Sequence, residues 1–235
     1  MVQHLLEYNF IWSGGPLIRR ETLLRVGLHD EANWCADWDM WLRIALAGDR
    51  FHCVQSVLGA YRVVTTSQMS NVARVEQHCE RLLRNAFKSG RLPAGVSAMG
   101  LSHFKWYVAG LYTNAGQPAE ASRALAEAIR IDPSFIADPA KVCQWLCVGA
   151  FDVRVSDPMA FIDSVFAHLP EEAAPIKPLY NRAKACALLG RAMCQHAAGD
   201  AVGKQQFLQD ALIADPALPH EPDLYVDFVI SMASD

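Results

Sequence analysis

Apolar residues recur at three- and four-residue steps along most of the chain after residue 70. This spacing is typical of one face of an amphipathic helix. In the segment 71–90 a glycine, Gly90, ends the pattern, as glycine commonly does at a helix C-terminus. The pattern therefore predicts a helix over 71–90, whose buried face consists of Val72, Val75, Cys79, Leu82, Leu83 and Phe87.

Before residue 70 short apolar stretches alternate with turns. The sequence "SGGPLIRRE" contains a glycine-proline loop, and "FHCVQSVLGAYRVV" is rich in β-branched and aromatic residues. Such stretches bounded by glycine or proline are typical of short strands. We therefore expect strands near 16–19, 51–56 and 58–63.

Two short helices are predicted among these strands. The segment 21–27 carries one or two helical turns that Gly27 ends, and 37–49 has a broad apolar face with Gly48 near its end. Glycine just past the last apolar residue is a common helix stop.

The change in pattern predicts two domains and a mainly α (α+β) fold. Residues 1–70 form a small α/β piece, and residues 71–235 form a helical domain after a linker at 91–95. An incomplete sheet leaves an open edge, which tends to pair with another chain or to be covered. We therefore expect self-association through residues 9–20 or through the helical region, or a helix docked on that edge.

The second half contains an internal repeat. Residues 114–135 align without gaps with residues 197–218, and Asp132-Pro133 matches Asp215-Pro216. In each copy a helix leads into a tight glycine turn, a second helix and an Asp-Pro pair, where proline stops the helix. The repeat predicts helical hairpins with turns at 114–118 and 198–201.

This arrangement resembles the tetratricopeptide (TPR) helix pair. Ala128 and Ala211 stand where that motif has small residues, whereas Lys204 and Gln195 depart from it. The two copies lie farther apart than one TPR unit of about 34 residues. Further helices over 138–170 must therefore separate them, and generic helical hairpins remain the alternative.

Composition and charge exclude several classes of protein. Hydrophobic residues make up 52% of the chain and charged residues 20%, with a net charge of −4. No basic block indicates a nucleic-acid groove. No segment reaches the roughly eighteen apolar residues of a membrane span, and the N-terminus lacks the features of a signal peptide. We expect a cytoplasmic protein, peripheral at the inner membrane if it acts there.

The seven cysteines support that location. They stand at positions 35, 53, 79, 143, 147, 186 and 194, an odd number with no CxxC spacing. This predicts free, mostly buried thiols in a reducing cytosol. Cys143 and Cys147 can share a helix face, but no neighbouring His or Cys in sequence completes a metal site.

The stretch "ANWCADWDMWLRIALAGDRF" places Asp37 and Asp39 among Trp34, Trp38 and Trp41. Acids two positions apart on a helix point roughly 200° away from each other, so this pair is a poor metal site. Asp37 stands at the helix start, where a carboxylate can cap free N–H groups. The alternative is that it does chemistry.

Residues 9–70 resemble the C-terminal half of the catalytic domain of family 2 glycosyltransferases, which have the GT-A fold. The segments that carry the resemblance are "SGGPLIRRETLLRVGLHDE", "ADWDMWLRIALAGDRF" and "LGAYRVVTTSQMS". It implies transfer of a sugar from a nucleotide-sugar donor to a glycan or lipid-linked acceptor. Asp37 matches the general base that activates the acceptor hydroxyl.

The resemblance also assigns substrate contacts. Trp34, Trp38 and Trp41 suit the packing of a sugar, although each also suits a core. Arg62 stands near the position that borders the donor diphosphate, or else forms a surface salt bridge. If Asp37 is the base, Asp39 lies outside the site and can pair with Arg43 across one turn.

The chain departs from that family in several ways. Ala36, His29 and Val64 replace a glutamate, a phenylalanine and a histidine. The family's nucleotide-binding half, with the acids that hold Mg²⁺ or Mn²⁺, should precede residue 9. We therefore expect an acceptor-side fragment that is inactive alone and has no cofactor site of its own. It would come from a truncated reading frame, from a longer protein or from a degenerate relative. The alternative function is a non-catalytic TPR-like protein-interaction module.

Overall fold

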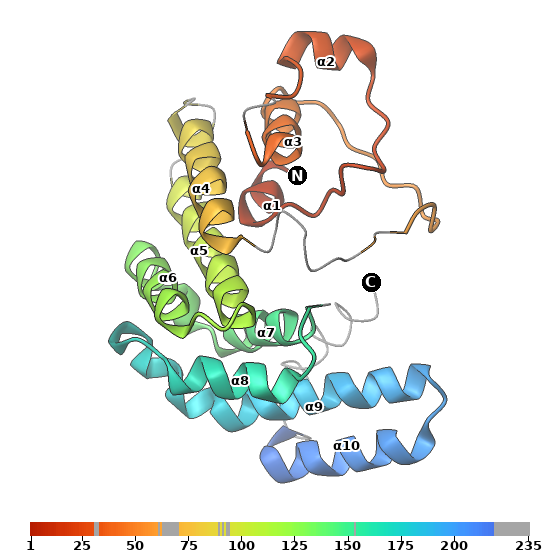
Figure 1. Cartoon of the computed structure of the whole chain (residues 1–235), viewed down its shortest axis with the longest axis vertical. Helices are drawn as coiled ribbons and strands as arrows, with labels where there is room; N and C mark the ends of the chain where they lie inside the picture. Colours follow the sequence, from red (N-terminus) through yellow and green to blue (C-terminus); the bar gives the residue numbers. More distant parts are fainter. Residues whose placement is uncertain are drawn as a thin grey trace. The chain divides into compact units, whose positions relative to one another are not determined.

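The structure is a computed structural model (Figure 1), and its regular elements within the described residues are all helical. The residues that it describes are 1–30, 33–60, 62, 71–88, 90, 92, 95–152 and 154–218. The chain divides into two compact units, Met1–Val108 (unit 1) and Ala109–Asp235 (unit 2). The division falls inside a helix rather than at residue 70, where the sequence pattern changes.

Unit 1 is built from helices, and all of them except α2 contribute buried side chains to its core. They are α1 (Val2–Glu7), α2 (Arg20–Val26), α3 (Ala36–Leu46), α4 (Val72–Lys88) and the first part of α5 (Val96–Asn114). Helix α3 packs on α1, α2 and α4. The predicted helices at 21–27, 37–49 and 71–90 are confirmed, with Gly27 and Gly48 at positive φ just past α2 and α3.

The predicted strands are wrong for the part of the chain that the structure describes. Residues 16–19 and 51–60 have no regular structure, and residues 61 and 63 lie outside the described residues. A strand needs a hydrogen-bonded neighbour, and neither segment has one among the described residues. The fold is therefore mainly α. The GT-A-like α/β piece is not supported, and an open sheet edge at 9–20 is absent from the described structure.

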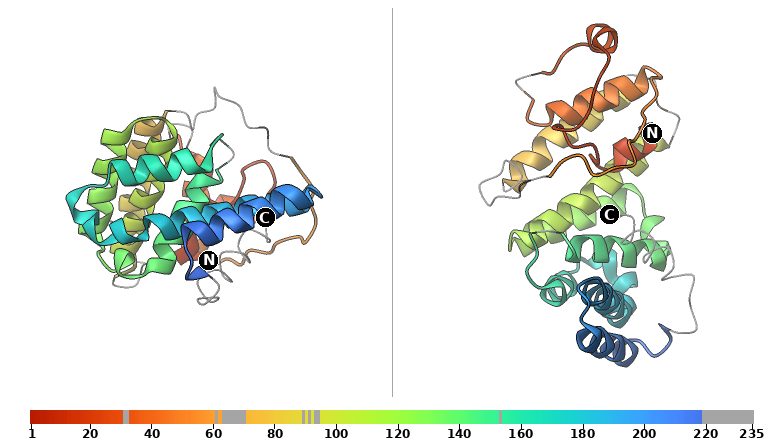
Figure 2. Two further views of the ribbon diagram at one scale, coloured as in Figure 1. Left: turned by 90° about the horizontal axis from the view of Figure 1, so that it is seen from below. Right: turned by 90° about the vertical axis from the view of Figure 1, so that its right-hand side faces the viewer.

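Unit 2 consists of consecutive helix pairs joined by short connections. They are the end of α5 with α6 (Pro118–Ile131), α7 (Pro139–Ala150) with α8 (Pro158–Ala167), and α9 (Tyr180–Ala197) with α10 (Ala201–Ala214). The 3₁₀ segments η2 (Phe135–Ala137) and η3 (Glu171–Leu179) connect the pairs. Figure 2 shows α9 and α10 side by side from two further directions.

The repeat correctly predicted the first and the third of these helix pairs. Gly116 and Gly199 occupy the tight turns with φ of 67° and 77°, a backbone region that only glycine adopts readily. Helices α6 and α10 end at Asp132 and Asp215, each followed by proline. The helices expected over 138–170 are α7 and α8.

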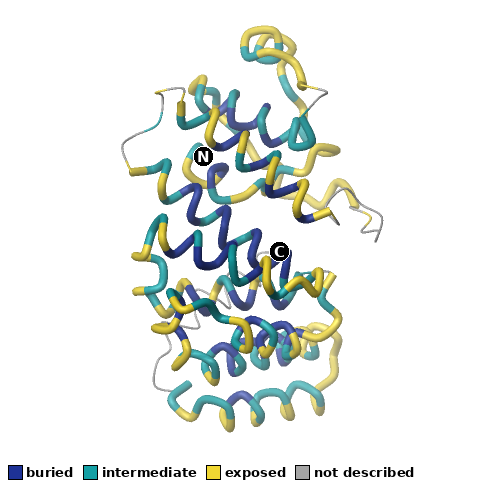
Figure 3. Tube along the Cα trace, turned by 60° about the vertical axis from the view of Figure 1, so that its left-hand side comes forward, coloured by how far each residue is buried: buried dark blue, intermediate teal, exposed yellow. Residues whose placement is uncertain are grey.

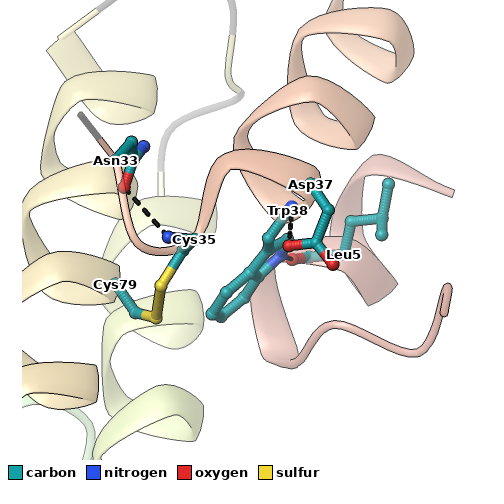
Figure 4. Close-up of a disulfide and its surroundings, with 6 residues drawn as sticks. All are labelled: Leu5, Asn33, Cys35, Asp37, Trp38 and Cys79. Carbon is teal, nitrogen blue, oxygen red and sulfur yellow. Dashed lines mark hydrogen bonds between the residues drawn. A yellow bond between two sulfur atoms is a disulfide. The ribbon is translucent and has the colours of Figure 1, made fainter. Parts of the chain in front are cut away.

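The expectation that all cysteines are free is wrong, because Cys35 and Cys79 form a disulfide (Figure 4). The bond joins the loop before α3 to the middle of α4, across a sequence separation of 44. Spacing along the chain does not reveal such a pair, since only the packing of α3 on α4 brings the two together. Cys143, Cys147 and Cys186 are free and buried, as expected, whereas Cys53 and Cys194 are free and exposed.

Candidate functional site

Asp37 lies in the first turn of α3 rather than at its N-cap. The helix begins at Ala36, and Cys35 occupies the cap position without a side-chain cap bond. The Oδ1 atom of Asp37 accepts a hydrogen bond of 2.7 Å from the backbone N–H of Trp38 (Figure 4). The carboxylate is half-buried and meets the positive end of the helix dipole. Its role as a base stays a prediction.

The three tryptophans of the predicted site lie in different surroundings. Trp38 and Trp41 are 3% and 2% exposed, and their indole N–H groups donate to the carbonyl oxygens of Leu5 (2.6 Å) and Ile11 (3.2 Å). Both rings belong to the core of unit 1. In this arrangement they offer no open face to a sugar, so that role requires local opening of the core.

Trp34 is held by α4 instead. The guanidinium of Arg74 lies 4.0 Å from the centroid of the Trp34 ring, and the His78 ring stacks on it at 6.0 Å between centroids. A cation over an indole face is a favourable contact. Trp34 therefore anchors the loop before α3 to α4, beside the disulfide. A sugar that bound to the ring face covered by Arg74 would have to displace the guanidinium.

The predicted pairing of Asp39 with Arg43 is confirmed at 2.8 Å. Arg43 has a second role that the sequence pattern did not indicate. Its guanidinium donates to the backbone carbonyls of Val26 (2.6 Å), Gly27 (2.8 Å) and Leu28 (3.0 Å). Carbonyls at a helix C-terminus lack partners within the helix, and a cation satisfies them. Asp39 thus orients the side chain that joins the end of α2 to α3.

Arg62 is exposed, and its neighbours at 61 and 63–70, including Val64, lie outside the described residues. The structure therefore gives no geometry for the predicted diphosphate contact, and nothing in it places Arg62 beside Asp37 or the tryptophans.

Three buried thiols meet in unit 2. Cys143 and Cys147 share a face of α7, as the sequence suggested, and Cys186 of α9 joins them. The hydrogen bond with Cys186, followed by burial, raises the pKa of Cys143 far above that of an ordinary thiol. A thiol that stays protonated is a poor nucleophile and a poor metal ligand. Across the described residues no three His, Cys, Asp or Glu side chains are arranged to hold a metal ion.

Helices α5, α6, α7 and α8 of unit 2 enclose a small hollow with an apolar floor. Trp145 of α7 forms one wall. The floor consists of buried side chains, Ala109, Ala121, Leu125 and Val165. The more exposed side chains at the hollow are polar, namely Thr113, Ser122, Ser164 and His168. A concave apolar surface with a few polar groups is typical of a binding site.

Two of these polar groups have defined hydrogen bonds. The Thr113 hydroxyl donates to the carbonyl of Ala109 at 3.0 Å, which leaves its oxygen as an acceptor. The Nδ1 atom of His168 lies 2.8 Å from the carbonyl oxygen of Ser164. A carbonyl can only accept, so Nδ1 carries a proton, and in the neutral tautomer Nε2 is an acceptor. The hollow therefore offers acceptors to N–H groups.

Sequence reasoning did not identify this hollow. Its residues come from four helices, and each looks like ordinary core or surface in its own segment. The usable signal was the prediction of stacked helical hairpins, which commonly create concave surfaces between helix pairs.

No protein-family model, curated protein or solved structure matches this chain. The resemblances to family 2 glycosyltransferases and to TPR proteins therefore rest on the quoted residues alone. Among the described residues, every helix is too short or too polar to cross a bilayer.

Proposed function

We propose that unit 2 is a TPR-like protein-interaction module that binds an extended peptide segment of a partner protein in the hollow between α5 and α8. The observation that carries the proposal is the combination of an apolar floor with acceptor groups around it. The hollow is small, with room for a methyl-sized group, so the peptide would insert an alanine or the end of one longer aliphatic side chain. Thr113 and His168, which line the hollow, would accept hydrogen bonds from backbone N–H groups of the peptide.

Filling the hollow should abolish peptide binding without unfolding the chain. Ser122 is half-buried at the hollow, so Ser122→Trp puts an indole where the aliphatic side chain would sit. The probe is a phage-displayed library of random peptides selected on the full chain. We expect selected peptides to share an aliphatic residue and to bind Ser122→Trp at least tenfold more weakly, a change of about 1.4 kcal/mol in binding free energy.

The matched control is Ala119→Trp, which adds the same side chain at an exposed position of α6. It should leave the affinity of the selected peptides unchanged, and circular dichroism should show full helix content in both variants. Equal affinities for the two variants, or a selection without enrichment, would exclude the hollow as a peptide site.

A second candidate function is the acceptor side of a glycosyltransferase, and a different observation favours it. Leu17, Val57 and Leu58 are 102%, 98% and 79% exposed, within segments whose composition is typical of strands. Apolar side chains in strand-like segments are normally covered by a neighbouring strand or chain. A nucleotide-binding half would supply that cover, together with the donor site and the divalent metal.

In that parent enzyme the chain would contribute acceptor contacts and a base. Asp37→Asn removes the carboxylate that accepts the proton, yet retains an oxygen for the N–H of Trp38. We expect turnover with a panel of nucleotide sugars to fall by about 10²-fold or more. The free energy of unfolding should stay within about 1 kcal/mol of the original.

Asp39→Asn is the matched control, because it removes the nearest acid of α3 and its ion pair with Arg43 but no predicted base. It should retain turnover. If Asp37→Asn folds and turns over normally, Asp37 has no part in the mechanism.

Either function was expected in the cytoplasm or at the inner face of a membrane. The cysteine pattern no longer supports that location, because a disulfide such as Cys35–Cys79 persists in oxidising rather than reducing compartments.

A further inference from the structure

Two segments of unit 1, residues 8–20 and 50–60, carry protruding aliphatic side chains. Leu17 lies in the first segment and is 102% exposed, while Val57 and Leu58 lie in the second and are 98% and 79% exposed. A Cβ atom added at Gly59 would come within 2.9 Å of the Trp12 ring, so the two segments meet there. In Figure 1 both segments run on the side of α3 away from α4.

The first segment also carries half-exposed aromatic rings. Tyr8, Phe10 and Trp12 are 49%, 42% and 43% exposed, and the centroids of the Tyr8 and Phe10 rings lie 5.6 Å apart. Tyrosine and tryptophan combine an apolar ring with one polar group, and both are enriched where a bilayer meets water. These rings therefore suit a boundary between an apolar and an aqueous phase.

The charge of these segments is positive, although the chain as a whole has a net charge of −4. Residues 8–20 and 50–60 contain no Asp or Glu, whereas Arg19, Arg20 and Arg50 are all exposed. Exposed arginines beside apolar side chains are attracted to anionic lipid headgroups, at about 1 kcal/mol for each cation near the surface.

Helix α2, which begins at the end of the first segment, adds little negative charge to this surface. None of its residues is buried, and it stands at the top of Figure 3. Its Arg25 pairs at 2.7 Å with Asp49, the acid next to Arg50. The acid nearest to the second segment is thereby neutralised, and Glu21 is the acid that directly follows the first segment.

We propose that residues 8–20 and 50–60 attach unit 1 to the surface of a bilayer of anionic phospholipids. Leu17, Val57 and Leu58 enter the acyl region, the aromatic rings lie at its boundary, and the arginines contact phosphates. A nucleic acid would satisfy the arginines but leave the aliphatic side chains in water. A lipid surface uses both features, and it covers the apolar side chains without a nucleotide-binding half.

Cosedimentation of the full chain with vesicles tests this proposal. We expect binding to vesicles of phosphatidylcholine and phosphatidylserine in equal parts, and much weaker binding to phosphatidylcholine alone. Leu17→Ser, Val57→Ser and Leu58→Ser combined should lower the affinity at least about tenfold. This triple variant should fold normally, because all three side chains protrude into solvent.

The charged part of the surface has its own variant. Arg19→Gln combined with Arg20→Gln should lower the affinity for the anionic vesicles by about tenfold or more. Added salt should weaken binding of the original chain, because ions screen exposed charges.

Matched controls change similar residues elsewhere on the chain. Val202→Ser with Ile213→Ser removes apolar side chains of α10 that are 82% and 78% exposed. Arg81→Gln with Lys88→Gln removes two exposed cations of α4. Both double variants should bind the anionic vesicles as the original chain does, and circular dichroism should show the same helix content in every variant.

Several results would overturn the proposal. Absence of vesicle binding would do so, as would equal affinity for the two kinds of vesicle. Binding that the triple variant retains, or that either control loses, would exclude this surface as the lipid contact. Dimers that form without lipid and dissociate in the triple variant, together with no vesicle binding, would make a second copy the occupant.

Discussion

Replacing Lys105 by methionine should lower the free energy of unfolding of unit 1 by about 3–5 kcal/mol. Lys105 is 3% exposed, and its ammonium lies 2.7 Å from carboxylate oxygens of both Glu76 and Glu80 on α4. Glu76 is itself 8% exposed. Methionine fills a similar volume but removes one partner of a buried ion pair, which is strongly destabilising. Urea denaturation at pH 7 measures the change.

Two further variants separate the buried charge from simple packing. Adding Glu76→Leu to Lys105→Met should recover most of the lost stability, because replacing both partners of a buried pair by apolar residues is often neutral. Arg84→Ala removes a more exposed partner of Glu80 and should cost less than about 1 kcal/mol. If Lys105→Met costs no more than Arg84→Ala, the pair does not stabilise unit 1 as proposed.

The ion pairs of Glu80 make the stability of unit 1 depend on pH. Burial raises the pKa of Glu80, but hydrogen bonds from Lys105 and Arg84 lower it by more, so the net pKa lies below the ordinary value of 4.5. A carboxyl group with a depressed pKa in the folded state stabilises the fold above its unfolded pKa. That contribution is lost as the pH falls below about 4.5 and through the folded pKa. The loss should be smaller in Lys105→Met.

The helices could be predicted because local chemistry sets both their faces and their ends. Val72, Val75 and Cys79 lie on the buried face of α4 because three- and four-residue steps return to one side of a helix. Helix α6 ends at Ile131 because Pro133 restricts Asp132 to an extended conformation. Such signals lie within a few residues of the feature that they determine.

Features that depend on distant neighbours could not be predicted. The segment 51–56 has a strand-like composition, but a strand also requires a partner, and its own sequence does not show whether one exists. Lys105 stands in an apolar run, and its pairing with Glu76 spans 29 positions. Trp38 and Trp41 are buried through contacts with Leu5 and Ile11, which lie about 30 positions away, and their role in a sugar site stays a prediction.

Removing the disulfide should lower the free energy of unfolding by about 4 kcal/mol. The bond links positions 44 apart, and in the unfolded chain it removes the entropy of a loop of that length. Cys35→Ala combined with Cys79→Ala breaks the link without burying a polar atom. The measurement is urea denaturation of unit 1 in the full chain under oxidising conditions.

The local loss of stability should be greatest at the start of α3. The disulfide and the contact of Arg74 with Trp34 both hold the loop before α3 against α4. Without the disulfide, amides from Asn33 to Trp38 should exchange faster, whereas those of unit 2 should not change. Dithiothreitol should destabilise the original chain by a similar amount but should not change the stability of the double variant. Cys53→Ala, at an exposed free thiol, should leave the free energy of unfolding within about 0.5 kcal/mol of the original. A non-reducing peptide map that shows free thiols at both Cys35 and Cys79 would remove the basis of this prediction, because the loop would then be held by the Trp34 contacts alone.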